Sequence, residues 1–168
     1  MKKILALVLS LMMIFALTTA VAEQTPVVAI EDLFEGVWVQ FEDGFEFYLP
    51  ADWYQAELTE EMNAKGIFYA AGTADFSYYC MLGWRPLAAE YTVEQLQAEL
   101  VVGYPDAAVV EVNGVGLVAY VDAENNLLNC IALDATEPGY YMFVFSPADD
   151  PDFQTLAALI ASTIRNVQ

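Results

Sequence analysis

The sequence predicts an α+β fold in which an antiparallel β-sheet of about six to seven strands is sandwiched between helices. Three observations predict it. Short stretches rich in β-branched and aromatic residues follow one another through tight turns, which makes them antiparallel neighbours. Apolar residues recur at helical spacing in two segments, 93–101 and 153–164. The element order is hairpin, hairpin, helix, meander, helix, and the helices must cover the apolar faces of the sheet.

The N-terminus has the three parts of a secretory signal peptide. Lys2 and Lys3 supply positive charge, residues 4–17 form an apolar run broken by one serine, and residues 20–22 are Ala-Val-Ala. We expect cleavage after Ala22. The apolar run has 14 residues, which is too short to span a bilayer comfortably. We therefore expect a secreted protein that is not inserted in a membrane. It would lie at the cell surface, in the medium, or in the periplasm of a cell with an outer membrane.

Composition excludes several classes of function. Without residues 1–22 the chain has 146 residues, with three basic residues against 24 acidic ones, a net charge of −21. Such a chain repels nucleic acid and anionic membranes, so we expect neither as a partner. It has no histidine, which excludes a Ser-His-Asp or Cys-His nucleophile pair. We expect no enzyme activity and no resident cofactor. The acidity keeps the protein soluble, and it would also attract a basic partner.

Residues 23–36 are expected to form an N-terminal tether, and residues 37–168 a single domain. In its first half, Asp43-Gly44 is a strong hairpin signal and Pro50 ends a strand. The elements expected here are strands at 37–41, 45–49, 67–71 and 76–84, and a short helix within 58–65 that ends before Gly66.

The second half holds the two longer helices and a meander. Thr92 and Gln95 form a capping box at the start of the first helix, which stops before Gly103. Asp150 and Pro151 suit the N-cap and the first position of the last helix. Between these helices, an Asn-Gly hairpin and two further turns separate strands at 108–112, 115–121, 127–134 and 140–146.

The segment FEFYLPADW at residues 45–53 resembles the strand, Leu-Pro pair and tryptophan that open PsbP-like domains. The capped helix, the meander and the closing helix are similar to the rest of that fold, which the Ran-GTPase nucleotide-release factors share. The resemblance covers residues 37–167 and implies a sheet between helices, with Trp53 over an edge of the core. Members stabilise a photosynthetic complex or bind a GTPase, so the resemblance implies a binding or accessory domain without catalytic residues.

Cys80 and Cys130 are the only cysteines, and both lie within expected strands. Outside the cell such a pair often bonds, so they are a disulfide candidate. The bridge would close a loop of about 50 residues and stabilise the fold by roughly 3–4 kcal/mol. The alternative is two buried free thiols that pack as small apolar side chains. Both interpretations stay open, because the sequence does not show whether the two strands are neighbours.

Two acidic segments are candidates for a cation site. Residues 122–126 alternate oxygen ligands as calcium loops do, but the glycine and the final glutamate of such a loop are missing. Asp149, Asp150 and Asp152 are the candidate metal ligands, with Ca²⁺ as the ion. The simpler interpretation is a polar hairpin turn for the first segment and a helix cap for the second.

Together, these patterns favour a secreted, non-catalytic accessory or protein-binding domain whose partner is a protein or cell-envelope component with basic patches. The alternative is an extracellular calcium- or glycan-binding protein. Carboxylate-based hydrolysis would need one pair of acids, and none of the 24 stands out. We expect the sheet to be buried on both faces, so that the aromatic residues of its strands are buried. If one face were exposed, its aromatic residues would favour protein or sugar binding.

Overall fold

The computed structural model describes residues 28–42 and 44–166. The predicted signal peptide at 1–22 and its cleavage site after Ala22 lie outside these residues. The described part of the chain is an α+β fold with antiparallel sheets, as the sequence predicts. None of its helices combines the length and apolar character needed to cross a membrane.

Seven strands form the larger sheet: β3 (Tyr54–Gln55), β4 (Ile67–Gly72), β5 (Tyr79–Pro86), β6 (Ala108–Val112), β7 (Val115–Asp122), β8 (Leu127–Leu133) and β9 (Gly139–Ser146). Their order across the sheet is β3-β4-β5-β9-β8-β7-β6, and all neighbours are antiparallel. Asn113 and Gly114 both have positive φ, which matches the tight turn predicted between β6 and β7. The short strand β3 is thus one edge of this sheet.

Three strands form a second, smaller sheet: β1 (Gly36–Gln40), β2 (Phe45–Pro50) and β10 (Arg165–Asn166), with β2 in the middle. Every residue of β2 is buried, because one face of the strand packs on the core and the other lies under neighbouring side chains. Phe34 and Trp38 both meet the ring of Tyr48 on that second face.

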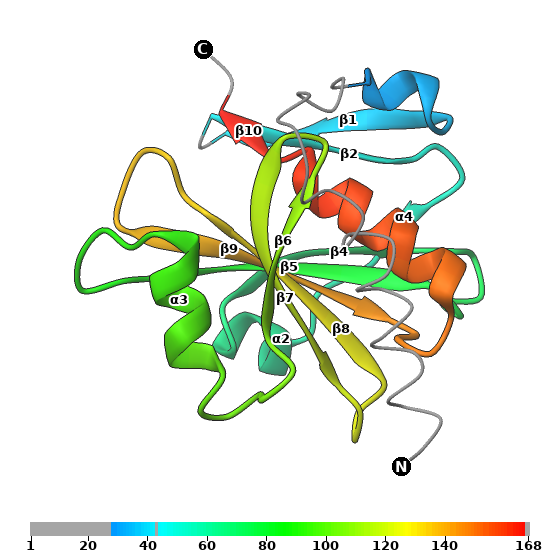
Figure 1. Cartoon of the computed structure of the whole chain (residues 1–168). Helices are drawn as coiled ribbons and strands as arrows, with labels where there is room; N and C mark the ends of the chain where they lie inside the picture. Colours follow the sequence, from blue (N-terminus) through cyan, green and yellow to red (C-terminus); the bar gives the residue numbers. More distant parts are fainter. Residues whose placement is uncertain (1–27, 43, 167–168) are drawn as a thin grey trace, which may run out of the picture.

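The helical elements are the short 3₁₀ turn η1 (Ile30–Asp32) and the helices α2 (Glu60–Ala64), α3 (Val93–Leu100) and α4 (Pro151–Ser162). Figure 1 shows α3 and α4 on opposite sides of the seven-stranded sheet, with the three-stranded sheet on the side of α4. The predicted capping box of α3 is present: Thr92 accepts from the Gln95 amide, and the Gln95 side chain accepts from the Thr92 amide.

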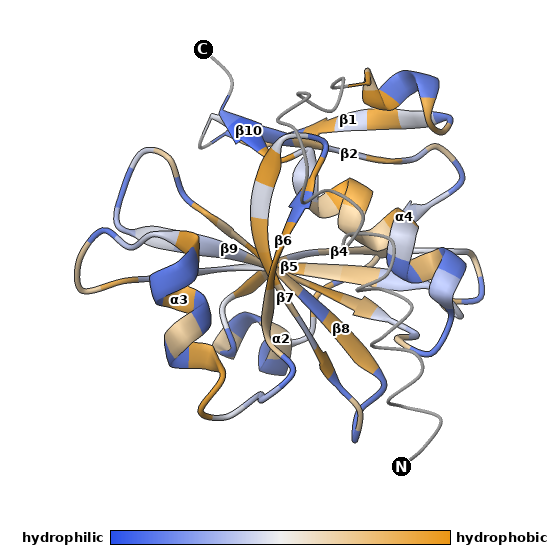
Figure 2. Ribbon diagram, in the orientation of Figure 1, coloured by the Kyte–Doolittle hydropathy of each residue, from blue (hydrophilic) through white to orange (hydrophobic). Residues whose placement is uncertain are grey.

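The main core lies between the seven-stranded sheet and the layer formed by α4 and β2. Phe143 of β9 is fully buried, and its ring meets that of Phe47 of β2 edge-on with centroids 5.4 Å apart. A smaller core lies under α3, where Leu96 packs on apolar residues of β7 and β8. Figure 2 shows the corresponding pattern, with apolar strands inside and polar residues on the outer side of α3. The sheet is covered on both faces over most of its area, as expected.

Three details differ from the prediction. The strands form two sheets, because β2 pairs with β1 and β10 and not with the larger sheet. Residues 76–78 form a turn and not the start of a strand, since the side chain of Asp75 closes a local turn there. The expected tether is packed on the domain from Val28: Ile30 is buried, and Asn113 exchanges two hydrogen bonds of 3.0 Å with the Val28 backbone.

Candidate functional site

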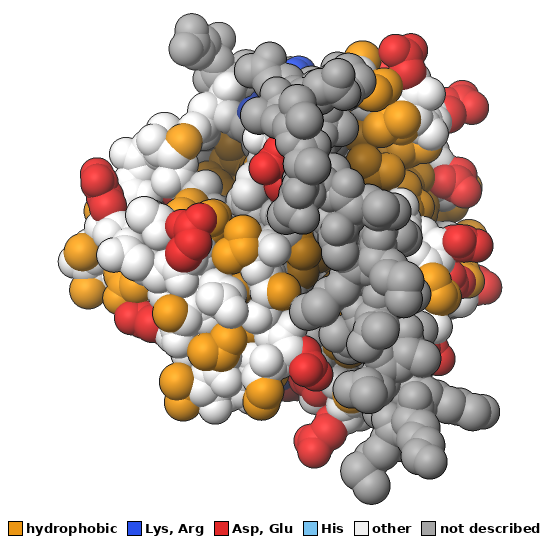
Figure 3. All heavy atoms as spheres, viewed as in Figure 1, with side chains coloured by type: hydrophobic (Ala, Val, Ile, Leu, Met, Phe, Trp, Pro, Cys, Tyr) orange, Lys and Arg blue, Asp and Glu red, His pale blue; other side chains and the backbone are white. Residues whose placement is uncertain are grey.

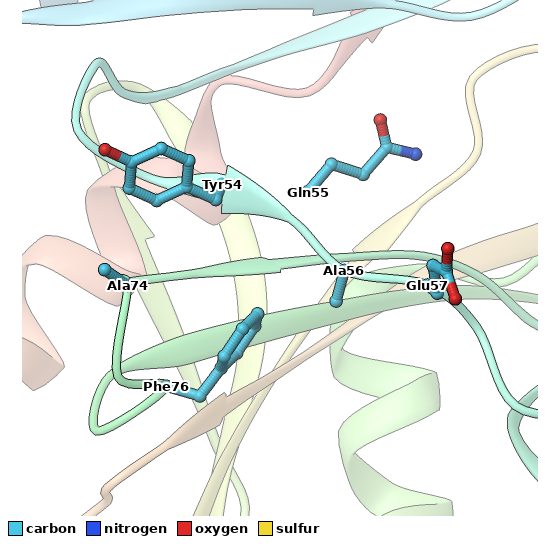
Figure 4. Close-up of a pocket in the computed structure, with 6 residues that line it drawn as sticks. All are labelled: Tyr54, Gln55, Ala56, Glu57, Ala74 and Phe76. Atoms are coloured by element: carbon cyan, nitrogen blue, oxygen red, sulfur yellow. The ribbon is translucent and has the colours of Figure 1, made fainter.

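Two shallow hollows flank the edge strand β3. The first, which we call the β3 hollow, has a volume of about 570 Å³. Figure 4 shows its lining, with the rings of Tyr54 and Phe76 on either side of Ala74. Tyr54 is 61% exposed and Phe76 is 43% exposed. The remaining lining residues are Gln55, Ala56 and Glu57.

The second hollow lies at the start of α4, and we call it the α4 hollow. Its volume is about 360 Å³. Phe153 is buried at its base, with Tyr78 packed edge-on against it at 4.9 Å and Trp53 tilted against it at 6.1 Å between ring centroids. Its lining comprises Pro50, Asp52, Trp53, Thr73, Tyr78, Asp150, Asp152, Phe153 and Leu156. Trp53 lines the α4 hollow and its neighbour in the sequence, Tyr54, lines the β3 hollow; we call the two hollows together the β3 edge surface.

The turn between β4 and β5 holds Phe76 in place in this surface. Phe76 has a φ of 54°, a left-handed conformation that is rare for a bulky residue and costs about 1–2 kcal/mol. The Asp75 carboxylate compensates by accepting hydrogen bonds from the Ser77 amide and from the Thr73 and Ser77 hydroxyls, at 2.8–3.1 Å. Strained residues of this kind concentrate at functional sites.

These hydrogen bonds lower the pKa of Asp75 from 3.8 to about 2, and the bond from the Ser77 amide has the largest effect. The pKa of Asp75 is lower in the folded protein than in the unfolded chain. The ionised carboxylate therefore stabilises the turn fully above pH about 4, and this stabilisation is lost as the pH falls through about 2. We expect the NMR shift of the Ser77 amide to titrate with a midpoint near pH 2, and to stay constant over this range in Asp75→Asn. A midpoint near 4 would show that the carboxylate is free.

Of the candidate metal ligands Asp149, Asp150 and Asp152, only Asp150 caps α4: Asp152 lies in the first turn of the helix, and Asp149 accepts from the Asn126 side chain. Asp150 Oδ1 accepts from the amides of Asp152 and Phe153, and its Oδ2 accepts from the Tyr78 hydroxyl at 2.9 Å. These bonds lower the pKa of Asp150, the Phe153 amide having the largest effect. Within residues 28–42 and 44–166, no three His, Cys, Asp or Glu side chains are grouped so that they could hold a metal. The helix-cap interpretation is the one the geometry supports.

The segment 122–126 is a polar turn between β7 and β8. Asp122 accepts from the amides of Glu124 and Asn125 and from the Asn125 side chain, and these contacts satisfy its oxygens locally. Asn126 has a positive φ, donates to Asp149 at 3.0 Å and accepts from the Ala148 amide at 3.0 Å. The turn therefore anchors the loop that leads into α4.

Cys80 and Cys130 are both free thiols, so of the two interpretations that the sequence leaves open the structure has the buried thiols and not the candidate disulfide. Cys80 lies on β5 opposite Phe145 of β9, and Cys130 lies on β8 opposite Phe143 of β9. The strand β9 thus separates them, and they are offset along it by two residues. Both are buried in the main core, and burial raises the pKa of each thiol to about 12.

The two buried thiols are expected to be inert in the folded protein, because a thiol with such a raised pKa does not form the reactive thiolate near neutral pH. A disulfide reagent such as Ellman's should label neither cysteine at pH about 8 in native buffer. In denaturant, without prior reduction, it should label both. Labelling that appears in denaturant only after reduction would contradict the free-thiol assignment.

Arg165 of β10 forms an ion pair in the small sheet. Its guanidinium lies 3.7 Å from the ring centroid of Trp38 and 2.7 Å from Glu46 Oε1. The side-chain amide of Gln40 also donates to Glu46. The contacts with Gln40 and Arg165 lower the pKa of the Glu46 carboxyl, and the hydrogen bond from Gln40 has the larger effect. The chain thus binds one of its own cations between an aromatic ring and a carboxylate.

The other two basic residues in the described part of the chain, Lys65 and Arg85, are also engaged. Lys65 pairs with Glu61 at 2.7 Å, and Arg85 donates to the backbone carbonyls of Lys65 and Trp84. Among the described residues, Glu46 and Glu61 are the only acids paired with a cation. Figure 3 shows the result, with acidic side chains around the visible face and few basic ones. Among residues 28–42 and 44–166, most acidic side chains therefore have no cationic partner.

The sequence pattern does not indicate the β3 edge surface, although Trp53 packs at an edge of the core as expected. Phe76 lies in a turn and not in the strand expected at 76–84, and Tyr54 belongs to the edge strand β3, which no periodic pattern predicts. The signal that could have identified the turn is the Thr-x-Asp-x-Ser pattern at 73–77, in which an Asp side chain is placed to bond the amide two residues on.

No protein-family model matches the sequence, and no curated protein matches it. Among solved structures, the chain is similar to the cyanobacterial PsbP protein (CyanoP) of Synechocystis sp. PCC 6803, with a TM-score of 0.55 and 12% identity over 89% of this chain and 98% of that one. It is also similar to a protein from Bacteroides thetaiotaomicron VPI-5482, with a TM-score of 0.50 and 12% identity over 74% of this chain and 45% of that one. The chain has a PsbP-like fold, as its sequence led us to expect.

Proposed function

We propose that the chain is a non-catalytic accessory domain that acts outside the cytoplasm and binds a basic protein or cell-envelope component through the β3 edge surface. The observation that carries the proposal is the combination of exposed aromatic rings and unpaired carboxylates at this edge. Tyr54 and Phe76 offer large, rigid contact areas of the kind that dominate protein interfaces.

Charge supports a basic partner. Asp52, Glu57, Asp75 and Asp152 are exposed at or beside the two hollows, and none of them is paired with a cation within the described residues. The mature chain carries a net charge of −21, and its own three cations are engaged elsewhere. Such a surface attracts a positively charged partner and repels another acidic one.

The residue chemistry supports a non-catalytic role. The chain has no histidine, and its two thiols are buried with their pKa raised to about 12. The Asp150 carboxylate is fully used in capping α4 and in accepting from Tyr78. The location outside the cytoplasm is inferred from the signal-peptide pattern of residues 1–22.

Affinity capture at two salt concentrations tests this proposal. Mature protein from Glu23 onward would be immobilised and exposed to envelope and secreted fractions of its own organism, at about 0.05 M and about 1 M salt, where the Debye length falls to about 3 Å. We expect a specific protein that binds at low salt at least about tenfold more tightly than at high salt. Binding that is independent of salt would contradict the electrostatic part, and an empty result at both would contradict the protein-binding role.

Glycan binding is the second candidate, and the exposed rings of Tyr54 and Phe76 on either side of Ala74 are the observation that favours it. Aromatic rings stack on sugars without needing charge, so glycan binding should be nearly independent of salt. A neutral oligosaccharide that binds the mature chain equally at both salt concentrations would favour this second function.

A further inference from the structure

We propose that the α4 hollow holds an arginine side chain of the basic partner. This inference rests on the proposed function and adds the chemistry by which one partner residue would be recognised. The hollow combines an aromatic wall with two unused carboxylates, and both features face the same open space beside the start of α4.

The aromatic part of the hollow is rigid. Phe153 is buried beneath it, and Trp53 and Tyr78 both pack against the Phe153 ring. Tyr78 is further fixed by its hydrogen bond of 2.9 Å to Asp150. Trp53 is half-buried, so part of its ring remains available to a cation, and tryptophan is the aromatic side chain that attracts cations most strongly.

Two carboxylates remain free to pair with that cation. Asp150 is fully engaged with Tyr78 and with two amides of α4. The side chains of Asp52 and Asp152 are exposed, line the same hollow, and make no hydrogen bond or ion pair with any described residue. Because Lys65, Arg85 and Arg165 are engaged elsewhere, no residue that the structure describes supplies a counter-charge to this hollow.

Arginine fits this arrangement better than lysine. A guanidinium is planar, so it can stack on an indole ring while its edge donates to carboxylates, whereas an ammonium is a compact and strongly hydrated point charge. The domain already contains one such arrangement, in which Arg165 lies 3.7 Å over Trp38 and pairs with Glu46. The α4 hollow has the ring and the carboxylates of this trio but lacks the cation. Its volume of about 360 Å³ lies at the lower end of ligand pockets, at about 300–1,000 Å³.

The probe for this inference is blocked arginine (N-acetyl-arginine amide), added to mature protein with ¹⁵N-labelled tryptophan. The three indole signals are distinct reporters, because the Trp38 and Trp84 N–H groups are hydrogen-bonded to Glu31 and Asp134. We expect a saturable shift of the Trp53 signal only, with a dissociation constant of about 1 mM, as suits a single side chain. Blocked lysine should bind more weakly, and blocked citrulline, which has nearly the same shape but no charge, should cause no saturable shift.

A matched pair of charge variants locates the site. Asp52→Asn/Asp152→Asn should weaken the binding of blocked arginine about tenfold, since both charge-assisted contacts to the guanidinium are lost. Glu90→Gln/Glu137→Gln removes the same charge from a separate hollow beside the β8–β9 loop and should bind like the wild type. Unchanged Trp38 and Trp84 indole signals in the double Asp variant would show that it is still folded, since both N–H groups are bonded away from this hollow.

Three results would overturn the arginine assignment: no saturable Trp53 shift, equal binding of citrulline, or equal weakening by both charge variants. If blocked arginine fails while salt-sensitive capture of a protein persists, the assignment of this hollow is wrong and the proposed function stands. If a neutral oligosaccharide binds the mature chain equally at both salt concentrations and blocked arginine does not bind, the glycan alternative is favoured over both.

Discussion

Replacing Phe143 by alanine is expected to lower the free energy of unfolding by about 3–5 kcal/mol. Phe143 is 0% exposed and lies in the middle of the main core. Its ring meets Phe47 of the small sheet at 5.4 Å and stacks with Phe145 at 5.9 Å, so its removal leaves a cavity between the two layers. Urea denaturation of the mature protein, analysed by linear extrapolation, would measure the loss.

Phe76→Ala is the matched control for this change, since it removes the same side chain from an exposed position. Its free energy of unfolding should change by no more than about 0.5 kcal/mol. If Phe143→Ala costs less than about 1 kcal/mol, the packing of α4 and β2 on the seven-stranded sheet described above is incorrect.

The second large effect concerns binding. The double variant Tyr54→Ser/Phe76→Ser is expected to lower the affinity for the captured partner at least about 30-fold, because interface aromatics of this kind contribute about 2 kcal/mol or more to binding. Both rings are exposed, so their replacement should leave the fold intact. Calorimetry or surface plasmon resonance with the purified partner would measure the change.

The control for this variant is Val102→Ser/Val109→Ser, which removes two exposed apolar side chains from the turn after α3 and from β6. Val102 is 88% exposed and Val109 is 39% exposed. This control should bind the partner with wild-type affinity. Equal weakening by both double variants would mean that the β3 edge surface has no special role.

Local signals in the sequence were sufficient to predict most of the secondary structure. Asn113-Gly114 forms the predicted turn, and Thr92 with Gln95 forms the predicted capping box. Asp150 caps α4 with its side chain, as its place before Pro151 indicated. The capping side chains bond to the backbone within a few residues, and the Asn-Gly turn depends on the positive φ of its own two residues, so these outcomes depend little on the rest of the fold.

Features that depend on distant parts of the chain could not be predicted. The strands β3 and β10 have two residues each, too few for a periodic pattern, and they exist because β4 and β2 supply partners. The order of strands keeps Cys80 and Cys130 from forming a disulfide, since β9 lies between β5 and β8. A sequence pattern does not show this order.

The candidate site contains one feature that the sequence predicts and one that it does not. The prediction that Trp53 covers an edge of the core is confirmed by its packing on Phe153. It was predictable because Trp53 follows within three residues of the buried strand β2. The exposure of Tyr54 and Phe76 was not predictable, because aromatic residues near strands are usually buried. It arises from the position of β3 at the sheet edge and from the Asp75 turn.

The most direct test of the central claim, that the β3 edge surface is the binding surface, is a hydrogen-exchange footprint of the mature protein with and without its captured partner. We expect slower exchange in residues 50–57, 73–78 and 149–156, which line or flank the two hollows. Slower exchange confined to α3 and β6, on the opposite side of the sheet, with no change at these three segments, would contradict the claim.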